Sequence, residues 1–201
     1  RRVPALWDVI NVRDFGAVGD AVTNDAAAIQ AALNVAGALN TGVIVELGNG
    51  YYYLGTTTLT IPTKVTLRGA SKQSTILGYN GSGIAIDMPA CKYSHLQGFR
   101  LGVGTSATVA LNIRTTAGND VRYCTFADLE IAGTITAGQI GIQIVATNPE
   151  IATENAFNDI LVSGFARSIV RTNTEGNTWR GIQIIDWGVG SSPIGLESSS
   201  N

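Results

Sequence analysis

The feature that most constrains this chain is a set of apolar columns that recur along it. When five segments are aligned, the fourth and the sixth positions of each segment are apolar, and successive segments lie 34, 30, 31 and 22 residues apart. Such a period is typical of solenoids, in which each repeat buries its apolar face only against its neighbours. The fourth column contains Val65, Phe99, Leu129, Ile160 and Ile182, and the sixth contains Leu67, Leu101, Ile131, Val162 and Ile184.

A second apolar strand is predicted after each of these segments. Apolar residues two positions apart are typical of β-strands, so each coil is expected to contain at least two short strands joined by loops of variable length. This pattern predicts an all-β fold, a right-handed parallel β-helix (a solenoid). The second strands are marked by Ile84, Leu111, Ile142, Ile169 and Ile194.

The outward positions predict contacts between successive coils. Arg100 and Glu130 lie one coil apart and are expected to pair across the inter-strand spacing of ~4.8 Å. An exposed pair of this kind contributes less than ~1 kcal/mol, so its structural role is small. Asn155 and Asn177 occupy equivalent turn positions and are expected to form a short amide ladder.

Composition excludes several classes of partner. The formal net charge is −2 and only 14% of the residues are charged, so the chain has no basic footprint for nucleic acid or for an anionic membrane. No apolar run approaches the ~20 residues of a transmembrane helix. Cys91 and Cys124 are the only cysteines; they form no disulfide framework and are expected to be buried thiols. The sequence begins Arg1-Arg2-Val3 and shows no signal peptide.

The N-terminal part of the chain has a different pattern. A short strand and a loop with Gly16 and Gly19 precede a predicted amphipathic helix, whose N-cap is expected to be Asp25. One apolar stripe is expected along this helix, made of Ala28, Ile29, Ala32, Leu33 and Ala36.

This segment resembles the N-terminal segment of pectate-lyase-like right-handed β-helix proteins. It departs from the family pattern at Ala21, Asn24 and Ala26, where the family has glycine, aspartate and threonine. The resemblance continues through residues 50–54 and 65–70, and so covers about the first third of the chain. The matching residues are Asn11, Val12, Asp14, Phe15, Gly16, Ala17, Gly19, Asp20, Thr23, Asp25, Ala28, Ile29, Gln30 and Ala31.

Within that family, the sequence of this segment is most similar to the N-terminal part of a bacteriophage tailspike or tail-fibre protein. The resemblance implies a helix that caps the open end of the solenoid and hides its strand edges. It also implies a homotrimer in the virion tail that recognises host surface polysaccharide beside other tail proteins. The expected organisation is a connector (1–9), a first strand, loop and capping α-helix (10–40), β-helix coils (41–197) and a linker or truncation point (198–201), as the first part of a longer β-helix.

Asp128 and Asp159 form the candidate catalytic pair. They fall in one column of consecutive coils, so their carboxyl groups are expected ~5 Å apart, close to the separation in retaining glycosidases. The alternative is that both occupy turns between strands, where Asp makes local hydrogen bonds. Asp186 and Glu197 are further carboxylates with less support.

Carbohydrate binding requires aromatic faces and short polar groups on an outer wall. The sequence motifs of polygalacturonase-like sites do not occur in this chain. The sequence also contains no evident cluster of acidic residues for calcium, so no metal or cofactor is predicted. The single histidine, His95, has no obvious partner. The candidate substrate-binding residues are Trp187, Tyr93, Tyr123, Glu130 and Arg100.

The sequence leaves open whether the protein is an enzyme. A tailspike-like protein that recognises polysaccharide, with or without endo-glycanase (depolymerase) activity, is the first interpretation. The alternatives are a non-catalytic structural module of a virion tail and a secreted polysaccharide lyase or hydrolase of the pectate-lyase type.

Overall fold

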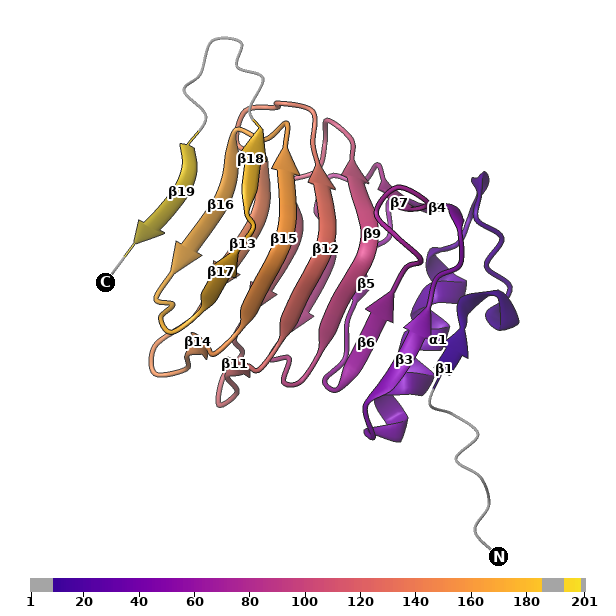
Figure 1. Ribbon diagram of the computed structural model, residues 1–201, viewed down its shortest axis with the longest axis horizontal. Helices are drawn as coiled ribbons and strands as arrows, with labels where there is room; N and C mark the ends of the chain where they lie inside the picture. Colours follow the sequence, from indigo (N-terminus) through magenta and orange to yellow (C-terminus); the bar gives the residue numbers. More distant parts are fainter. Residues whose placement is uncertain (1–8, 186–193, 200–201) are drawn as a thin grey trace, which may run out of the picture.

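The computed structural model describes residues 9–185 and 194–199, and there the chain winds into a parallel β-helix. Strands of successive coils stack side by side along the long axis (Figure 1), and every named strand pair is parallel. The predicted fold class, a mostly β solenoid with a helix at its N-terminal end, is confirmed.

Within the described residues, three sheets form the walls of the solenoid. The largest has 11 strands, the second has six, and a short pair, β11 (Val121–Arg122) and β14 (Ala152–Thr153), forms the third. The path of the largest sheet is β1 (Val9–Asn11), β3 (Val43–Glu46), β6 (Val65–Arg68), β9 (His95–Val103), β12 (Thr125–Ala132), β15 (Ala156–Ser163) and β17 (Thr178–Arg180), with β2 (Asp20–Asn24), β4 (Gly50–Gly55), β7 (Thr75–Tyr79) and β18 (Gln183–Ile185) attached. The second sheet contains β5 (Leu59–Thr60), β8 (Ile84–Pro89), β10 (Val109–Arg114), β13 (Ile140–Val145), β16 (Arg167–Thr172) and β19 (Ile194–Ser199).

The predicted inward columns are correct through the central coils. Phe99 is in register with Leu129, and Leu129 with Ile160, and all three are buried. Next to them, an aromatic stack runs along the axis: the ring centroids of Phe126 and Phe157 lie 4.6 Å apart, and those of Phe157 and Trp179 lie 4.0 Å apart. Trp179, at the end of the stack, is only partly buried.

The predicted register is wrong in the first aligned coil. Leu67 lies beside Leu96 and not beside Leu101, whose true neighbour is Leu77. The prediction failed because two short strands, β6 and β7, together occupy the place that the single long strand β9 occupies in the next coil. The loop between them, residues 69–74, breaks the spacing, so Val65 does not lie beside Phe99.

All five residues that were predicted to mark the second strands lie in strands of the second sheet. Leu111, Ile142 and Ile169 are also in register with one another, whereas Ile84 pairs with Val109 and Ile194 pairs with Arg167. A period of two cannot distinguish positions two residues apart when both carry apolar side chains. The strand β5, which the sequence reading missed, begins this sheet.

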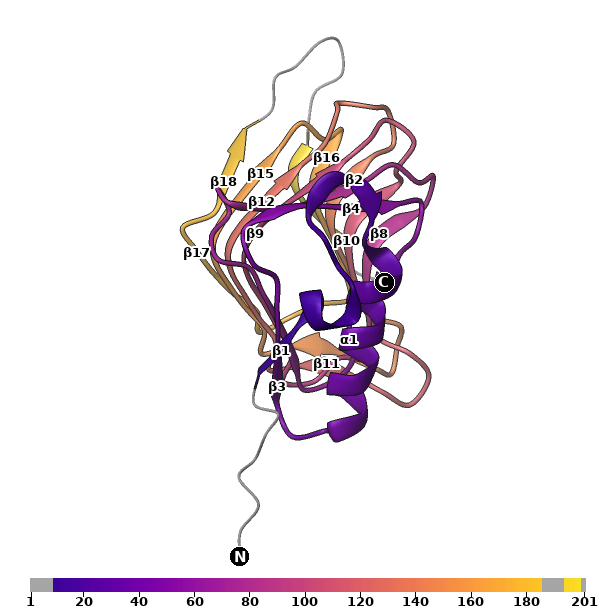
Figure 2. The ribbon, with the colours of Figure 1, turned by 90° about the vertical axis from the view of Figure 1, so that its right-hand side faces the viewer.

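The capping helix α1 (Ala26–Leu39) lies across the N-terminal end of the solenoid, the end that faces the viewer in Figure 2. It packs against the 3-10 helix η1 (Val12–Phe15) and against β3. Its buried residues are Ala26, Ile29, Ala32, Leu33 and Ala36, which reproduces the predicted stripe except that Ala28 is only partly buried.

Asp25 is the N-cap residue of the helix, as predicted, but its side chain makes no capping hydrogen bond to the helix. Its side chain is buried, and its two carboxylate oxygens accept hydrogen bonds from Val18 N (2.7 Å) and Gly19 N (3.1 Å). The amide of Ala26 instead donates to Asn24 Oδ1. Asp25 therefore holds the glycine-containing loop against the helix.

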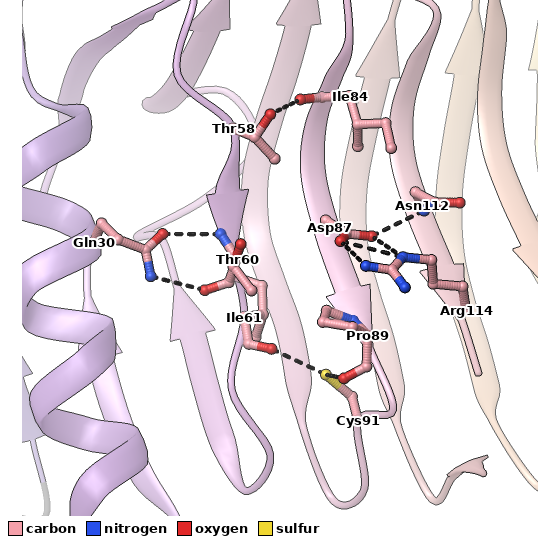
Figure 3. Close-up of polar contacts among 10 residues, drawn as sticks. All are labelled: Gln30, Thr58, Thr60, Ile61, Ile84, Asp87, Pro89, Cys91, Asn112 and Arg114. Carbon is pink, nitrogen blue, oxygen red and sulfur yellow. Dashed lines mark hydrogen bonds and ion pairs between the residues drawn. The ribbon is translucent and has the colours of Figure 1, made fainter. Parts of the chain in front are cut away.

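One side chain of α1 closes an edge of the second sheet (Figure 3). The amide of Gln30 pairs with the backbone of Thr60 in β5: Oε1 accepts from Thr60 N at 2.8 Å, and Nε2 donates to Thr60 O at 3.0 Å. These are the bonds that a further strand would make, so Gln30 takes the place of one.

Polar side chains also tie one coil to the next. On the outer face of β8 and β10, the Asp87 carboxylate accepts from Asn112 Nδ2 (2.8 Å) and from two nitrogens of Arg114 (Figure 3). The predicted amide ladder is confirmed, because Asn155 Nδ2 donates to Asn177 Oδ1 at 3.0 Å.

The two cysteines are buried free thiols, as predicted. The Cys91 thiol donates to Ile61 O in the preceding coil, and the Cys124 thiol donates to Cys91 O. Burial raises the pKa of both thiols, that of Cys124 to about 11, so both stay protonated at neutral pH. Among the described helices, none is long and apolar enough to cross a membrane.

Candidate functional site

The outer wall of the largest sheet bends along a column of residues with left-handed backbone. Gly98, Asp128, Asp159 and Gly181 follow one another in successive coils, with φ of 69°, 49°, 52° and 61°. Glycine adopts this conformation freely, and Asp and Asn are among the side chains that tolerate it best. The alternative interpretation, that both aspartates occupy turns between strands, is wrong, because Asp128 lies inside β12 and Asp159 inside β15.

The structure brings Asp128 and Asp159 together in one hollow of about 380 Å³. Because they occupy equivalent positions on paired strands, their backbones are separated by about one inter-strand spacing, ~4.8 Å. Leu161 and Gln183 line the same hollow from the neighbouring outward column. Whether the two carboxylates act on a substrate remains a prediction.

Lys72 is a residue of this hollow that sequence reasoning missed. Its Nζ lies 3.1 Å from Asp128 Oδ1, whereas Asp159 makes no ion pair among the described residues. Lys72 belongs to the loop between β6 and β7. That loop lies close because Gly69 meets Gly98 at the bend, where an added Cβ on Gly69 would overlap the Gly98 carbonyl oxygen. The signal in the sequence was the pair Gly69 and Gly98, but their proximity becomes evident only once the register of the coils is known.

Arg100 and Glu130 form the predicted ion pair, with Arg100 Nε 3.4 Å from Glu130 Oε1. Both point outward in the column next to the bend. Arg100 also lines a second hollow, of about 270 Å³, together with Tyr51 and a run of small residues. Tyr51 was not among the predicted site residues, because β4 was not recognised as part of the same wall.

Tyr93 and Tyr123 stack on each other, with ring centroids 5.0 Å apart and planes 15° apart. They are 52% and 42% exposed, and line neither of the two hollows. They precede the bend by five residues, in another column of left-handed residues that includes Lys64 and Glu154. A hydrogen bond to Glu154, and its charge, raise the pKa of the Tyr123 hydroxyl. Each ring uses one face on the other, so only part of the pair is open to a sugar.

The remaining candidates are placed as follows. Trp187 and Asp186 lie outside the described residues, and Glu197 is in β19, of which only the backbone is described. His95 is half-buried at the start of β9, and burial lowers its pKa. Within the described part of the chain, no group of three or more His, Cys, Asp or Glu side chains is arranged to hold a metal ion.

The fold defines the class of protein, a parallel β-helix. Residues 9–87, less than half of the chain, match the family model described as rhamnogalacturonase A/epimerase, pectate lyase-like. No curated protein matches the chain in sequence.

Solved structures share this fold at low sequence identity. Tailspike protein 2 of the Escherichia coli O157:H7 bacteriophage CAB120 is 15% identical, with a TM-score of 0.64 over 89% of this chain and 27% of its own. A GH87 α-1,3-glucanase from Streptomyces thermodiastaticus is 15% identical, with a TM-score of 0.68 over 98% of this chain and 36% of its own. The A-module of the mannuronan C-5 epimerase AlgE4 from Azotobacter vinelandii is 20% identical, with a TM-score of 0.57 over 87% of this chain and 59% of its own. The chain thus spans less than two thirds of each of these structures.

Proposed function

We propose that this chain is part of a tailspike-like or tail-fibre-like protein that recognises host surface polysaccharide through the hollow at Asp128 and Asp159. The observation that carries the proposal is the convergence of two carboxylates and Lys72 in one hollow of the outer wall. The fold is shared with a phage tailspike, a glucanase and an alginate epimerase, which supports the same direction.

The side chains of this hollow suit a sugar. Carboxylate and amide oxygens of Asp128, Asp159 and Gln183 can accept hydrogen bonds from hydroxyl groups, and Lys72 can donate. Leu161 offers an apolar surface for the C–H face of a pyranose ring. The hollow is open along the wall, so an internal segment of a long polysaccharide can enter it without a free chain end.

Endo-hydrolysis is a second candidate function of the same hollow, favoured by the carboxylates of adjacent coils. Retaining glycosidases place two carboxyl groups ~5–5.5 Å apart. Asp159 would protonate the glycosidic oxygen while Asp128 attacks the anomeric carbon and forms a glycosyl ester. Water would then cleave the ester and lose its proton to Asp159, which restores both groups.

The test is incubation of the protein with a panel of capsular and lipopolysaccharide glycans, followed by size exclusion and mass spectrometry. Shortened chains whose mass includes one added water identify a hydrolase. Products formed without added water identify elimination, as in a lyase. Binding without cleavage would indicate recognition of the polysaccharide without catalysis. Neither binding nor cleavage, in a preparation shown by light scattering to be trimeric, would favour a structural module of a virion tail.

The variants Asp128→Asn and Asp159→Asn test the pair directly. Asn tolerates the left-handed backbone of both positions, so the bend and the fold are expected to persist. If the carboxylates are catalytic, each variant loses cleavage by roughly 10³-fold or more and retains binding within about tenfold. Cleavage at the wild-type rate in both variants would exclude the pair.

A further inference from the structure

Six outward side chains form one continuous column along the wall beside the bend. Strand pairing places Tyr51 next to Ile76, and Ile76 next to Arg100. The same pairing continues from Arg100 to Glu130, and from there through Leu161 to Gln183. Five steps at the inter-strand spacing make a track of roughly 24 Å, parallel to the solenoid axis.

Each end of this column opens into one of the two hollows. Leu161 and Gln183 line the hollow of Asp128 and Asp159, while Tyr51 and Arg100 line the other. Glu130 lies between them and binds Arg100 through Nε. The hollows are therefore parts of one surface that strand register makes continuous.

The Tyr51–Arg100 hollow is built from an aromatic ring, a cation and small residues. The ring of Tyr51 lies over Gly78, where an added Cβ would overlap its hydroxyl and ring carbons. Gly102, Gly104 and Gly133 also line this hollow, beside Asn80, Val103, Ala132 and Thr134. At the glycines a flat ligand can approach the backbone closely.

The two hollows differ in charge. The lining of the Tyr51–Arg100 hollow includes the Arg100 guanidinium and no carboxylate. Its ion pair with Glu130 is made through Nε at 3.4 Å, and a guanidinium carries four further N–H groups on its terminal nitrogens. A guanidinium fork binds carboxylate and phosphate groups well. The other hollow holds two carboxylates, which disfavour an anion.

We propose that this column is a single binding track for an extended polysaccharide, and that the Tyr51–Arg100 hollow is a distal subsite for a sugar unit that carries a negative charge. The inference rests on the proposed function and adds to it the direction of the bound chain and the class of glycan. The spacing of ~4.8 Å between strands of successive coils is close to the length that one hexopyranose adds to an extended polysaccharide, so successive sugars meet successive coils. The glycan is a heteropolymer in which anionic units occur a few residues from neutral ones.

Arg100→Gln is the test variant, and Arg68→Gln is its matched control. Arg68 likewise forms a partly exposed ion pair, with Glu46 at 3.0 Å, but lines neither hollow. Both variants lose one charge and one surface pair, so thermal unfolding is expected to change equally little.

The experiment measures binding of the wild type and both variants to an array of acidic and neutral capsular polysaccharides. Carboxyl-reduced or dephosphorylated forms of each bound glycan are included. We expect acidic heteropolymers to bind, Arg100→Gln to weaken this by about tenfold and Arg68→Gln to leave it unchanged. Removal of the negative charge from the glycan should weaken wild-type binding by the same factor as Arg100→Gln does. The wild type and Arg100→Gln should then bind the uncharged glycan equally.

Two results would overturn the subsite. One is binding of neutral glycans alone, and the other is acidic-glycan binding that Arg100→Gln and Arg68→Gln affect equally. In both, polysaccharide recognition stands while the distal subsite fails. Absence of binding to every glycan instead removes the proposed function itself.

Discussion

At the scale of single residues, Asp25 shows how a side chain can carry a role other than the one its position suggests. It stands at a helix start, yet its carboxylate is buried and satisfies two amides of the preceding loop. Hydrogen bonds to a charged acceptor are among the stronger ones, and their loss leaves buried donors unpaired.

We expect Asp25→Ala to lower the free energy of unfolding by about 3 kcal/mol, because Val18 N and Gly19 N lose their acceptor. Asp14→Ala, at an exposed position of the same segment, should change it by less than about 0.5 kcal/mol. Equilibrium denaturation measures both. Equal effects of the two substitutions would mean that the Asp25 contacts are not stabilising.

His95 makes the stability of the folded chain depend on pH through a single residue. Burial lowers its pKa below the usual 6.5, so the unfolded chain binds this proton more tightly than the folded one does. Stability is therefore fully present above about pH 6.5 and decreases as the pH falls toward the folded-state pKa.

We expect the imidazole resonance of His95 to titrate below 6.5, and the free energy of unfolding to fall between pH 7.5 and 5.5. His95→Gln should remove most of this slope, since the chain has no other histidine. A titration midpoint at or above 6.5 would show that the imidazole is better solvated than its position implies.

At the scale of structural elements, the interior stack of Phe126, Phe157 and Trp179 links three successive coils of the largest sheet. Phe157 lies at its centre and contacts a ring on each side. Stacking of this kind adds to the free energy of burial, so the central ring is expected to be the most costly to remove.

We expect Phe157→Ala to destabilise the protein by about 3–5 kcal/mol, and Phe157→Leu by much less because most of the volume is retained. Tyr123→Ala removes a ring from the exterior stack and should cost less than about 1.5 kcal/mol. Denaturant titration compares the three variants, and similar losses for Phe157→Ala and Tyr123→Ala would contradict this account.

The sequence was informative where a coil repeats its neighbour and failed where coils differ. Leu129 and Ile160, or Arg100 and Glu130, were placed correctly because equal spacing implies equal register. Lys72 and Tyr51 were missed because the first coils divide one long strand into two, which changes the spacing without changing the wall. The left-handed backbone of Asp128 and Asp159 inside β12 and β15 was not predicted, because nothing in the sequence shows that one column both bends the wall and lines a hollow.

At the scale of the whole molecule, the solenoid must end its sheets without exposing them to other chains. Gln30 does so for the second sheet by pairing with both backbone groups of Thr60. An open strand edge invites pairing with a further strand.

We expect Gln30→Ala to cost about 1–2 kcal/mol and to promote self-association as the protein concentration rises. Asn34→Ala is the matched control, since it removes the bond from Gln30 Nε2 to Asn34 Oδ1 and leaves the pairing with Thr60 intact. Sedimentation velocity over a range of concentrations distinguishes the two, and identical profiles would show that the edge is protected by other means.

The column of Gly98, Asp128, Asp159 and Gly181 has a consequence for how such a wall can change over evolutionary time. A position that demands left-handed backbone admits few residue types, and aspartate is one of them. A single base change converts a glycine codon of the GGT or GGC type to an aspartate codon, so an acid can arise at the bend while the path of the chain is kept. Duplication of a coil would then place another carboxylate in line with the first, and the length of the acidic row would follow the number of coils.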